Sequence, residues 1–278
     1  MRKAALVRES SRSEGETESE LSSSQASSSE KHILNFLSMR RRNFSSSLLE
    51  NFHIQGWRWH TKSLARDAER LKKLASKTET KDAETLKEAC DFVVGFNMMG
   101  LHKIESTTFF PWMKEKLTSG FQGNPDLPTA FASTMDTLEN YRVEVASLGN
   151  TISTKAMIAC DADSSESRRS EAIAEVAKQS AELSNLVQRM ISIEDTLLVP
   201  AIGAIVPTKE QKAFNNKVLM KLGLLDSRLH LVGMYEAVWD GDDAVEKELF
   251  QEAIPGISRK MIPRWKRKLY QPKTYMLE

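Results

Sequence analysis

The sequence predicts an all-α protein, an antiparallel four-helix bundle with additional C-terminal helices. Four long stretches between about residues 50 and 203 carry apolar residues at the three- and four-residue spacing of a helical face. Short connections rich in Gly, Pro or Ser separate these stretches, as in an up-and-down bundle. No segment alternates apolar and polar residues in the manner of a β-strand.

The chain divides into three predicted parts. Its 278 residues, 40% of them hydrophobic, suffice for one large domain with appendages. Residues 1–43 form a Ser- and Glu-rich tail, expected to be disordered because few apolar side chains repay the entropy of ordering. Residues 44–206 form the bundle, and residues 207–278 form a helical extension. Within the first part, His32–Met39 is an apolar patch, either a helix docked on the domain or the end of the tail.

The four helices of the bundle are expected at about Phe52–Leu74, Asp82–Leu117, Thr129–Ser153 and Ser170–Ala201. In the first helix, His60 begins an inward stripe of residues that continues through Leu64. Trp57 and Trp59 flank His60 and are expected to keep water away from it. Pro111 is expected to kink the second helix or to mark where it thins, because proline removes one backbone hydrogen bond.

Two connections follow from turn-forming residues. Gly120, Gly123, Pro125 and Pro128 predict the turn between the second and third helices. The acidic and Ser-rich stretch Cys160–Arg169 predicts a loop that also supplies the N-cap of the fourth helix.

A pair of residues with metal-binding chemistry lies in the second helix. His102 and Glu105 are three residues apart, so both project from one face, where an imidazole and a carboxylate can share a metal ion. The segment has an internal repeat, because Ile104–Pro111 matches Ile193–Pro200 in its Ile, Glu, Thr and Pro positions. The second copy keeps the carboxylate, Glu194, and has no imidazole.

The inward donors predicted for a metal are His60, His102, Glu105 and Glu194, with Asp67, Asp136 or Asp195 as supplements. Two histidines and one carboxylate satisfy a mononuclear iron site, whereas a di-iron centre wants more ligands. One metal is therefore easier to support than two. The alternative is that these side chains form buried hydrogen-bonded pairs, His60 with Glu194 and His102 with Glu105.

Several of these residues together resemble a known family. The inward His60, the His102-x-x-Glu105 pair followed by Phe-Phe-Pro, and Glu194-Asp195 followed by Val-Pro are similar to the hemerythrin-like (HHE cation-binding) domain family, over roughly residues 50–203. The resemblance implies a four-helix bundle with a non-haem di-iron centre that binds oxygen, senses iron or handles nitric oxide damage. It also implies that His60, His102, Glu105 and Glu194 are iron ligands.

The chain departs from the family at three other ligand positions. The third-helix histidine of the family falls near Thr134 or Met135, the fourth-helix histidine is replaced by Met190, and Leu101 stands where many members have a second histidine. The predicted cofactor is therefore mono- or dinuclear iron on a reduced ligand set. The predicted function is iron binding for sensing, storage, or binding of O₂ or NO. The alternative is a metal-free bundle that serves as an interaction module.

Other classes of function have little support in the sequence. No nucleophile elbow, phosphate loop or catalytic triad spacing is present, so we expect no enzyme. A net charge of +1 gives no general reason to expect nucleic acid as a partner. The absence of a run of about 18 apolar residues argues against a membrane-spanning helix.

The expected location is the cytoplasm, since Cys90 and Cys160 lie far apart in the sequence and in no metal-ligand spacing. Organellar targeting stays open, because Arg2, Lys3, Arg8 and Arg12 come early among serines, although five glutamates between residues 9 and 20 oppose it.

The extension is predicted to begin with one long helix, Thr208–Trp239, capped by Thr208 with Gln211 in the capping-box position. His230 lies near its apolar stripe, where a packing or surface role is expected. A short helix is expected at Asp243–Ala253. The basic and aromatic residues from 262 to 275 are expected to form an extended segment packed across the bundle, with an acidic membrane surface or nucleic acid as the alternative partner.

Overall fold

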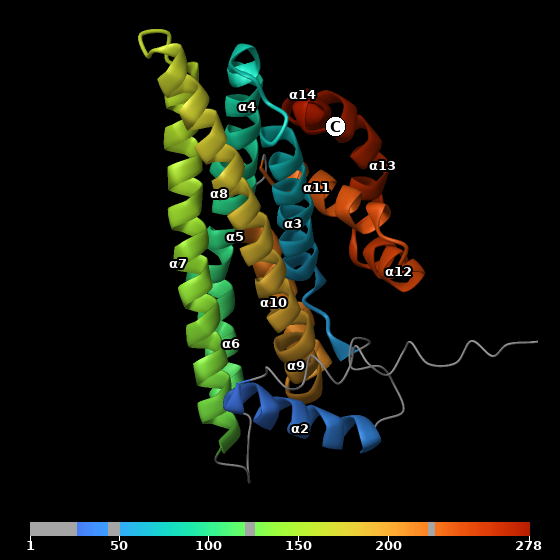
Figure 1. The fold of residues 1–278 in the computed structure, drawn as a ribbon. Helices are drawn as coiled ribbons and strands as arrows, with labels where there is room; N and C mark the ends of the chain where they lie inside the picture. Colours follow the sequence, from blue (N-terminus) through green and yellow to red (C-terminus); the bar gives the residue numbers. More distant parts are fainter. Residues whose placement is uncertain (1–26, 44–50, 120–125, 222–225) are drawn as a thin grey trace, which may run out of the picture.

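The computed structural model describes residues 27–43, 51–119, 126–221 and 226–278 (Figure 1). Helices account for nearly all of these residues, and none of them belongs to a β-strand. The all-α prediction is therefore confirmed. None of the helices in these ranges combines the length and the apolar character that crossing a membrane requires.

Four long helical segments lie side by side in Figure 1, and we refer to them together as the helical core. They are α3 (Gln55–Ala75), a column of short segments over residues 83–119, α7 (Asp126–Cys160), and a second column over residues 166–205. The segment α8 packs against both α7 and α3, which places the interior between all four. Each of the four starts within a few residues of its predicted position, and α7 extends beyond both predicted ends.

The first column replaces the single predicted second helix. It consists of α4 (Ala83–Cys90), the π-helical η3 (Asp91–Met98), α5 (Met99–Ile104), the π-helical η4 (Glu105–Phe109) and α6 (Phe110–Ser119). Helical structure thus continues through Pro111, which is the second residue of α6.

Of the two predicted connections, the turn before α7 is described only in part, and the one after α7 is described in full. Gly120, Gly123 and Pro125 of the predicted turn lie outside the described residues. Pro128 lies in the first turn of α7, where a missing N–H breaks no intrahelical bond. After α7, Ser165 caps α8 by accepting a hydrogen bond from the backbone N–H of Arg168, as the predicted N-cap requires.

The second column contains α8 (Glu166–Ile193), the π-helical η5 (Glu194–Leu198) and α9 (Val199–Ile205). The interior between the columns is filled by large apolar side chains that are fully or almost fully buried, among them Leu64, Leu71, Leu86, Phe109, Phe131, Leu138, Leu183 and Val187. Burying one such side chain contributes about 1.5–3 kcal/mol, so this interior is the main source of stability.

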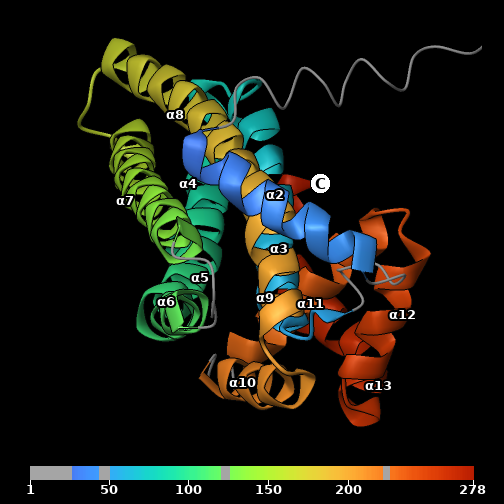
Figure 2. The same ribbon diagram turned by 90° about the horizontal axis from the view of Figure 1, so that it is seen from below.

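One helix precedes the core. The segment α2 (Ser28–Asn43) crosses one end of the core in Figure 2 and contacts α7, η5 and α9. Its Ile33 and Leu37 are buried. Of the two interpretations of the apolar patch, the docked helix is therefore the one observed, and the predicted tail over residues 1–43 is too long. Residues 1–26 lie outside the described residues.

The C-terminal extension consists of α10 (Thr208–Lys221), α11 (Asp226–Asp240), α12 (Ala244–Ala253), α13 (Gly256–Trp265), the π-helical η6 (Lys266–Tyr270), α14 (Gln271–Thr274) and the short η7 (Tyr275–Leu277). In Figure 1, α12, α13 and α14 lie outside the core on the α3 side, and α11 packs directly on α3. The Asp243 side chain caps α12, whose bounds agree with the prediction.

The single long helix predicted over residues 208–239 is wrong. Asn215 accepts a hydrogen bond from the N–H of Gly56, and the ring of His230 lies 4.4 Å from that of His60. Gly56 and His60 are about 6 Å apart along α3, whereas 15 residues of straight helix would span about 22 Å. The helices α10 and α11 therefore do not lie on one straight axis.

Two further predictions for the extension are corrected. The Gln211 side chain is buried and bonds the carbonyls of Asn51 and Val206 and the N–H of His53, so it ties the entry of α3 to α10. Residues 262–275, expected to be extended, are helical instead, and they pack one face on α11, burying Ile262 and Tyr270.

Candidate metal centre

Two carboxyl groups are buried inside the helical core, close enough for the charge of one to raise the pKa of the other. Glu105 is 0% exposed and Glu194 is 2% exposed, and they occupy equivalent positions of the internal repeat, at the start of η4 and of η5. The indole N–H of Trp57 donates to Oε1 of Glu105 at 3.3 Å. Oε2 of Glu105 and Oε1 of Glu194 have no hydrogen-bond partner among the described residues. The pair therefore has acceptor capacity that the protein does not use.

The local backbone explains why both acids sit at wide helical turns. The N–H of Phe110 donates to the carbonyl of Glu105, five residues back, and the N–H of Val199 does the same to Glu194. The next residue in each copy is a proline, which donates no hydrogen bond and crowds the carbonyl four residues earlier. A π-helical turn relieves this crowding, and such turns are frequent at functional sites.

The threonine of each repeat reinforces the same geometry. Thr107 donates its hydroxyl to the carbonyl of Lys103, and Thr196 donates to that of Ser192. Such back-bonding competes with the regular ladder and bends a helix. The sequence repeat is therefore also a structural repeat, in which Glu, Thr and Pro act together.

Burial dominates the electrostatics of the acid pair. It raises the pKa of Glu105 to about 8, against the smaller opposing effect of the Trp57 hydrogen bond. Burial also raises the pKa of Glu194 well above its ordinary value, and the nearby charge of Glu105 raises it further. Neither acid forms an ion pair in the described structure. At neutral pH, the pair therefore holds at least one proton unless a cation replaces it.

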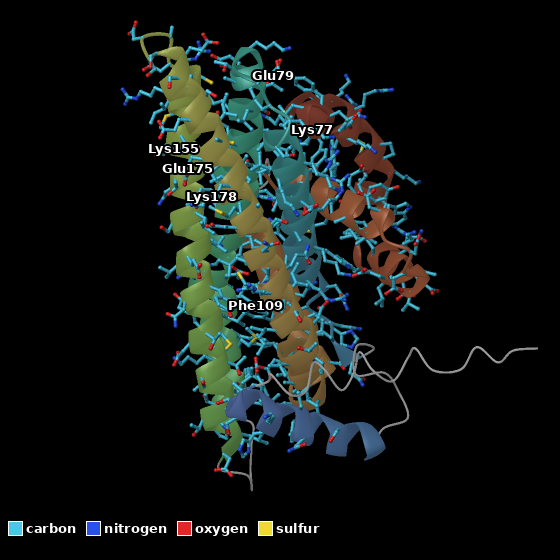
Figure 3. All side chains as sticks on the ribbon, in the orientation of Figure 1. Lys77, Glu79, Phe109, Lys155, Glu175 and Lys178 are labelled. Atoms are coloured by element: carbon cyan, nitrogen blue, oxygen red, sulfur yellow. The ribbon has the colours of Figure 1, made fainter. Side chains whose placement is uncertain are left out.

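Figure 3 labels Phe109, whose side chain is fully buried in the core. The ring stacks on Trp57, with centroids 3.9 Å apart and an interplanar angle of 21°. Trp57 is thus fixed by stacking on one residue and by a hydrogen bond to Glu105. The prediction that Trp57 excludes water from the first helix agrees with its exposed fraction of 1%.

His102 lies in α5, one turn before Glu105, and is buried. Its Nε2 has no partner among the described residues. Burial lowers the pKa of His102 to about 4, and the charges of Arg142 and Glu139 on α7 act on it in opposite directions. The imidazole is therefore neutral at pH 7, with one nitrogen that is not engaged by the protein.

His60 is engaged elsewhere. Its Nε2 lies 3.2 Å from Oδ1 of Asn97, and the amide nitrogen of Asn97 donates to Asp67 at 2.8 Å. The ring of His60 also lies 4.4 Å from that of His230, which stacks on Phe96 with centroids 4.3 Å apart. Burial lowers the pKa of His60 well below its ordinary value. His60 is therefore a member of a buried polar network that joins α3, η3 and α11.

The proposed supplementary acids have other partners. Asp67 is fully buried, lies near Arg66 and Arg70, and has its pKa raised to about 6 by burial. Asp136 is exposed and pairs with Lys114, and Asp195 pairs with Arg58. None of the three supplements the Glu105–Glu194 pair.

The four predicted ligands are thus brought together only in part. In the portion of the chain that is described, no three His, Cys, Asp or Glu side chains are grouped closely enough to hold one ion. Two carboxylates with unpaired oxygens and one imidazole with an unpaired nitrogen suit a single oxygen- and nitrogen-liganded cation. They do not suit a di-iron centre, which needs more donors than this inventory offers. The predicted pairs of His60 with Glu194 and of His102 with Glu105 are not observed as hydrogen bonds.

Two residues that matter here were not singled out in the sequence. Asn97 bridges two buried titratable groups, and Phe96 stacks on His230. Of the two roles expected for His230, packing is the one observed, because its ring lies 4.4 Å from that of His60. For Asn97 a signal exists, since an amide eight residues before Glu105 falls on the inward face of an otherwise apolar stretch.

These features define an all-helical protein with an uncompensated acid pair in its interior. Comparison of the chain with protein-family models, with curated protein sequences and with solved structures finds no match. The resemblance to the hemerythrin-like domain family therefore stays a prediction from the residues quoted above.

Proposed function

We propose that the helical core is an antiparallel four-helix bundle of the hemerythrin type and that it binds one divalent metal ion, iron by expectation, in its interior. The observation that carries this proposal is the pair formed by Glu105 and Glu194, each buried and each with one unused oxygen. Two buried acids without a counter-ion are costly, and a divalent cation offsets that cost.

The residues that would hold the ion are Glu105 and Glu194, with His102 as the nitrogen ligand. Carboxylate oxygens and a neutral imidazole are donors that ferrous iron accepts. Since the three side chains are not grouped in the described arrangement, the third ligand comes from solvent or from rotation of the His102 side chain. A site with so few protein ligands leaves positions for a small molecule, which supports sensing, storage, or binding of O₂ or NO as its use.

The test is an anaerobic titration of the metal-free protein with ferrous iron, followed by calorimetry and by analysis of iron retained after desalting. We expect about one equivalent per chain, because a single preformed acid pair supplies one site. Glu194→Gln keeps the size of the side chain and removes its charge, so it should lower the affinity at least tenfold, or about 1.4 kcal/mol.

The matched control is Asp136→Asn, which removes one negative charge from the exposed face of α7. It should leave iron binding within about twofold of the wild type, as expected for an exposed ion pair. Retention of less than about a tenth of an equivalent by the wild type would contradict the proposal. Equal affinity of the wild type and Glu194→Gln would contradict it as well.

A metal-free interaction module is the second candidate, because the His60 network is already complete without an ion. Asn97 holds His60, and His230 covers it from the extension. On this alternative, iron leaves the thermal unfolding temperature unchanged, and His102→Ala has the same partner binding with and without iron. On the metal-binding proposal, iron raises the unfolding temperature of the wild type and not that of Glu194→Gln.

A further inference from the structure

A pocket of about 390 Å³ lies in the C-terminal extension, between α11, α12 and α13. None of its lining residues belongs to the candidate metal centre. Its wall is aromatic, because the rings of Tyr235 and Trp239 stack with centroids 4.3 Å apart and Trp239 meets Phe250 edge-on at 5.7 Å. Ile262 completes the apolar surface. The volume falls in the range of small-molecule sites, roughly 300–1,000 Å³.

The same pocket is lined by two cations. Arg259 and Lys260 are exposed residues of α13, and neither forms an ion pair with any described residue. A Cβ placed on Gly256, which also lines the pocket, would lie 3.7 Å from Nη2 of Arg259, so the guanidinium is beside the pocket. No carboxylate is among the lining residues, and the remaining member is Gln251. The charge at this pocket is therefore positive and uncompensated.

The aromatic wall and the two cations together determine which kind of ligand fits this pocket. An aromatic wall favours a planar or aliphatic body that leaves water, and unpaired Arg and Lys side chains favour an anionic group, since charge-assisted hydrogen bonds are about twice as strong as neutral ones. The first turn of α13, whose N-cap Pro255 provides no side-chain cap, adds a weaker contribution of the same sign. A cation or a neutral sugar would fit this pocket less well, because neither carries an anionic group for Arg259 and Lys260.

We propose that this pocket binds an amphipathic monoanion, with its apolar body against Tyr235, Trp239 and Phe250 and its acidic head group on Arg259 and Lys260. The ligand class is a small carboxylate or sulfonate with an aromatic or aliphatic body. This site is separate from the acid pair of the core, so it is occupied with or without metal.

Two probes that differ only in charge test the proposal on the full chain. The fluorescent anion 1-anilinonaphthalene-8-sulfonate carries an aromatic body and one sulfonate, and N-phenyl-1-naphthylamine is the same body without the sulfonate. We expect saturable binding of the anion at one site per chain. The double variant Arg259→Gln/Lys260→Gln should weaken binding of the anion at least tenfold and leave that of the neutral probe within about twofold.

The matched control is Arg264→Gln/Arg267→Gln, which removes the same charge from exposed residues that do not line the pocket. It should leave binding of the anion within about twofold of the wild type. An equal loss in both double variants would overturn the proposal, because the probe would then report a general basic surface. Binding of the anion that is unchanged in Arg259→Gln/Lys260→Gln, or no saturable binding by the wild type, would overturn it too. All four substitutions are at exposed positions, and thermal unfolding verifies that each variant folds.

Discussion

The indole N–H of Trp57 donates to Oε1 of Glu105 at 3.3 Å, which fixes one oxygen of the carboxyl group and leaves the other unpaired. Trp57 comes from α3 and Glu105 from the first turn of η4, so the bond joins two of the four long segments. The position of the acid in the core is thus set by a neighbouring helix as well as by its own.

Trp57→Phe tests this bond. Phenylalanine retains a ring to stack on Phe109 and loses the donor, so we expect a loss of about 1–3 kcal/mol in the free energy of unfolding, measured with urea. The control is Trp59→Phe, because Trp59 is equally buried and its Nε1 has no hydrogen-bond partner among the described residues. A loss in Trp59→Phe as large as in Trp57→Phe would show that ring size, and not the hydrogen bond, sets the effect.

The acid pair predicts a specific dependence of stability on pH in the metal-free protein. Glu105 has an ordinary pKa of 4.5 when unfolded and one of about 8 when folded. The folded state therefore binds more protons, so stability is full below about pH 4.5 and is lost as the pH rises toward 8. The buried histidines oppose this only below their ordinary pKa of 6.5, so the window from pH 7 to 9 isolates the acids.

Between pH 7 and 9, Glu105→Gln should reduce that loss by about 1–1.5 kcal/mol, because only the last pH unit below the folded pKa of about 8 falls in this window. Glutamine is neutral at every pH and keeps an acceptor for Trp57. The measurement is urea unfolding from pH 7 to 9 in the presence of a chelator, with Asp136→Asn as the variant that should leave the profile unchanged. A parallel profile for wild type and Glu105→Gln would contradict the assignment of this slope to Glu105.

Asn97 is predicted to be the key residue of the His60 network. Asn97→Ala leaves Asp67 and His60 buried without their shared partner, and we expect a loss of about 2–4 kcal/mol in the free energy of unfolding. The exposed Asn150 on α7 provides the control, since Asn150→Ala should change stability by less than about 0.5 kcal/mol. Equal effects would mean that the network contributes nothing.

Alanine substitutions at two glycines of the first column, Gly100 and Gly95, should change stability in opposite directions. A Cβ on Gly100 would lie 2.6 Å from Cε1 of His230, whereas a Cβ on Gly95 would meet nothing within 4 Å. Gly100→Ala should therefore destabilise by about 1–3 kcal/mol and expose the extension to protease, because α11 must move. Gly95→Ala should stabilise by about 0.5–1 kcal/mol through helix propensity. If Gly100→Ala is as stable as the wild type, His230 is not packed against this column.

The sequence predicted the class of fold and the long core segments because helical periodicity is a local property that each segment displays by itself. It did not predict the π-helical turns, since nothing in the apolar pattern distinguishes a helix with i to i+4 bonds from one with i to i+5 bonds. The repeat with proline after each Glu-x-Thr was visible, and its structural meaning required the backbone hydrogen bonds of Phe110 and Val199.

The burial of the two acids of the candidate site could be predicted from the sequence, whereas the partners of His60 could not. Glu105 and Glu194 are buried because each belongs to an apolar stripe, and in both copies of the repeat the acid begins a π-helical turn. His60 lies on the predicted face, but its partner Asn97 comes from another segment and its cover, His230, from the extension. Such pairings depend on the register between segments, which sequence spacing alone does not determine.

The most direct measurement is a diffraction experiment on crystals soaked anaerobically with ferrous iron, with data collected on both sides of the iron absorption edge. We predict one anomalous peak between the side chains of Glu105 and Glu194, within about 2.0–2.6 Å of an oxygen of each, the range for divalent cations on oxygen ligands. The same soak of Glu194→Gln should show no peak there. An empty map in the wild type, with the two carboxyl groups hydrogen-bonded to each other through a shared proton, would contradict metal binding in this core.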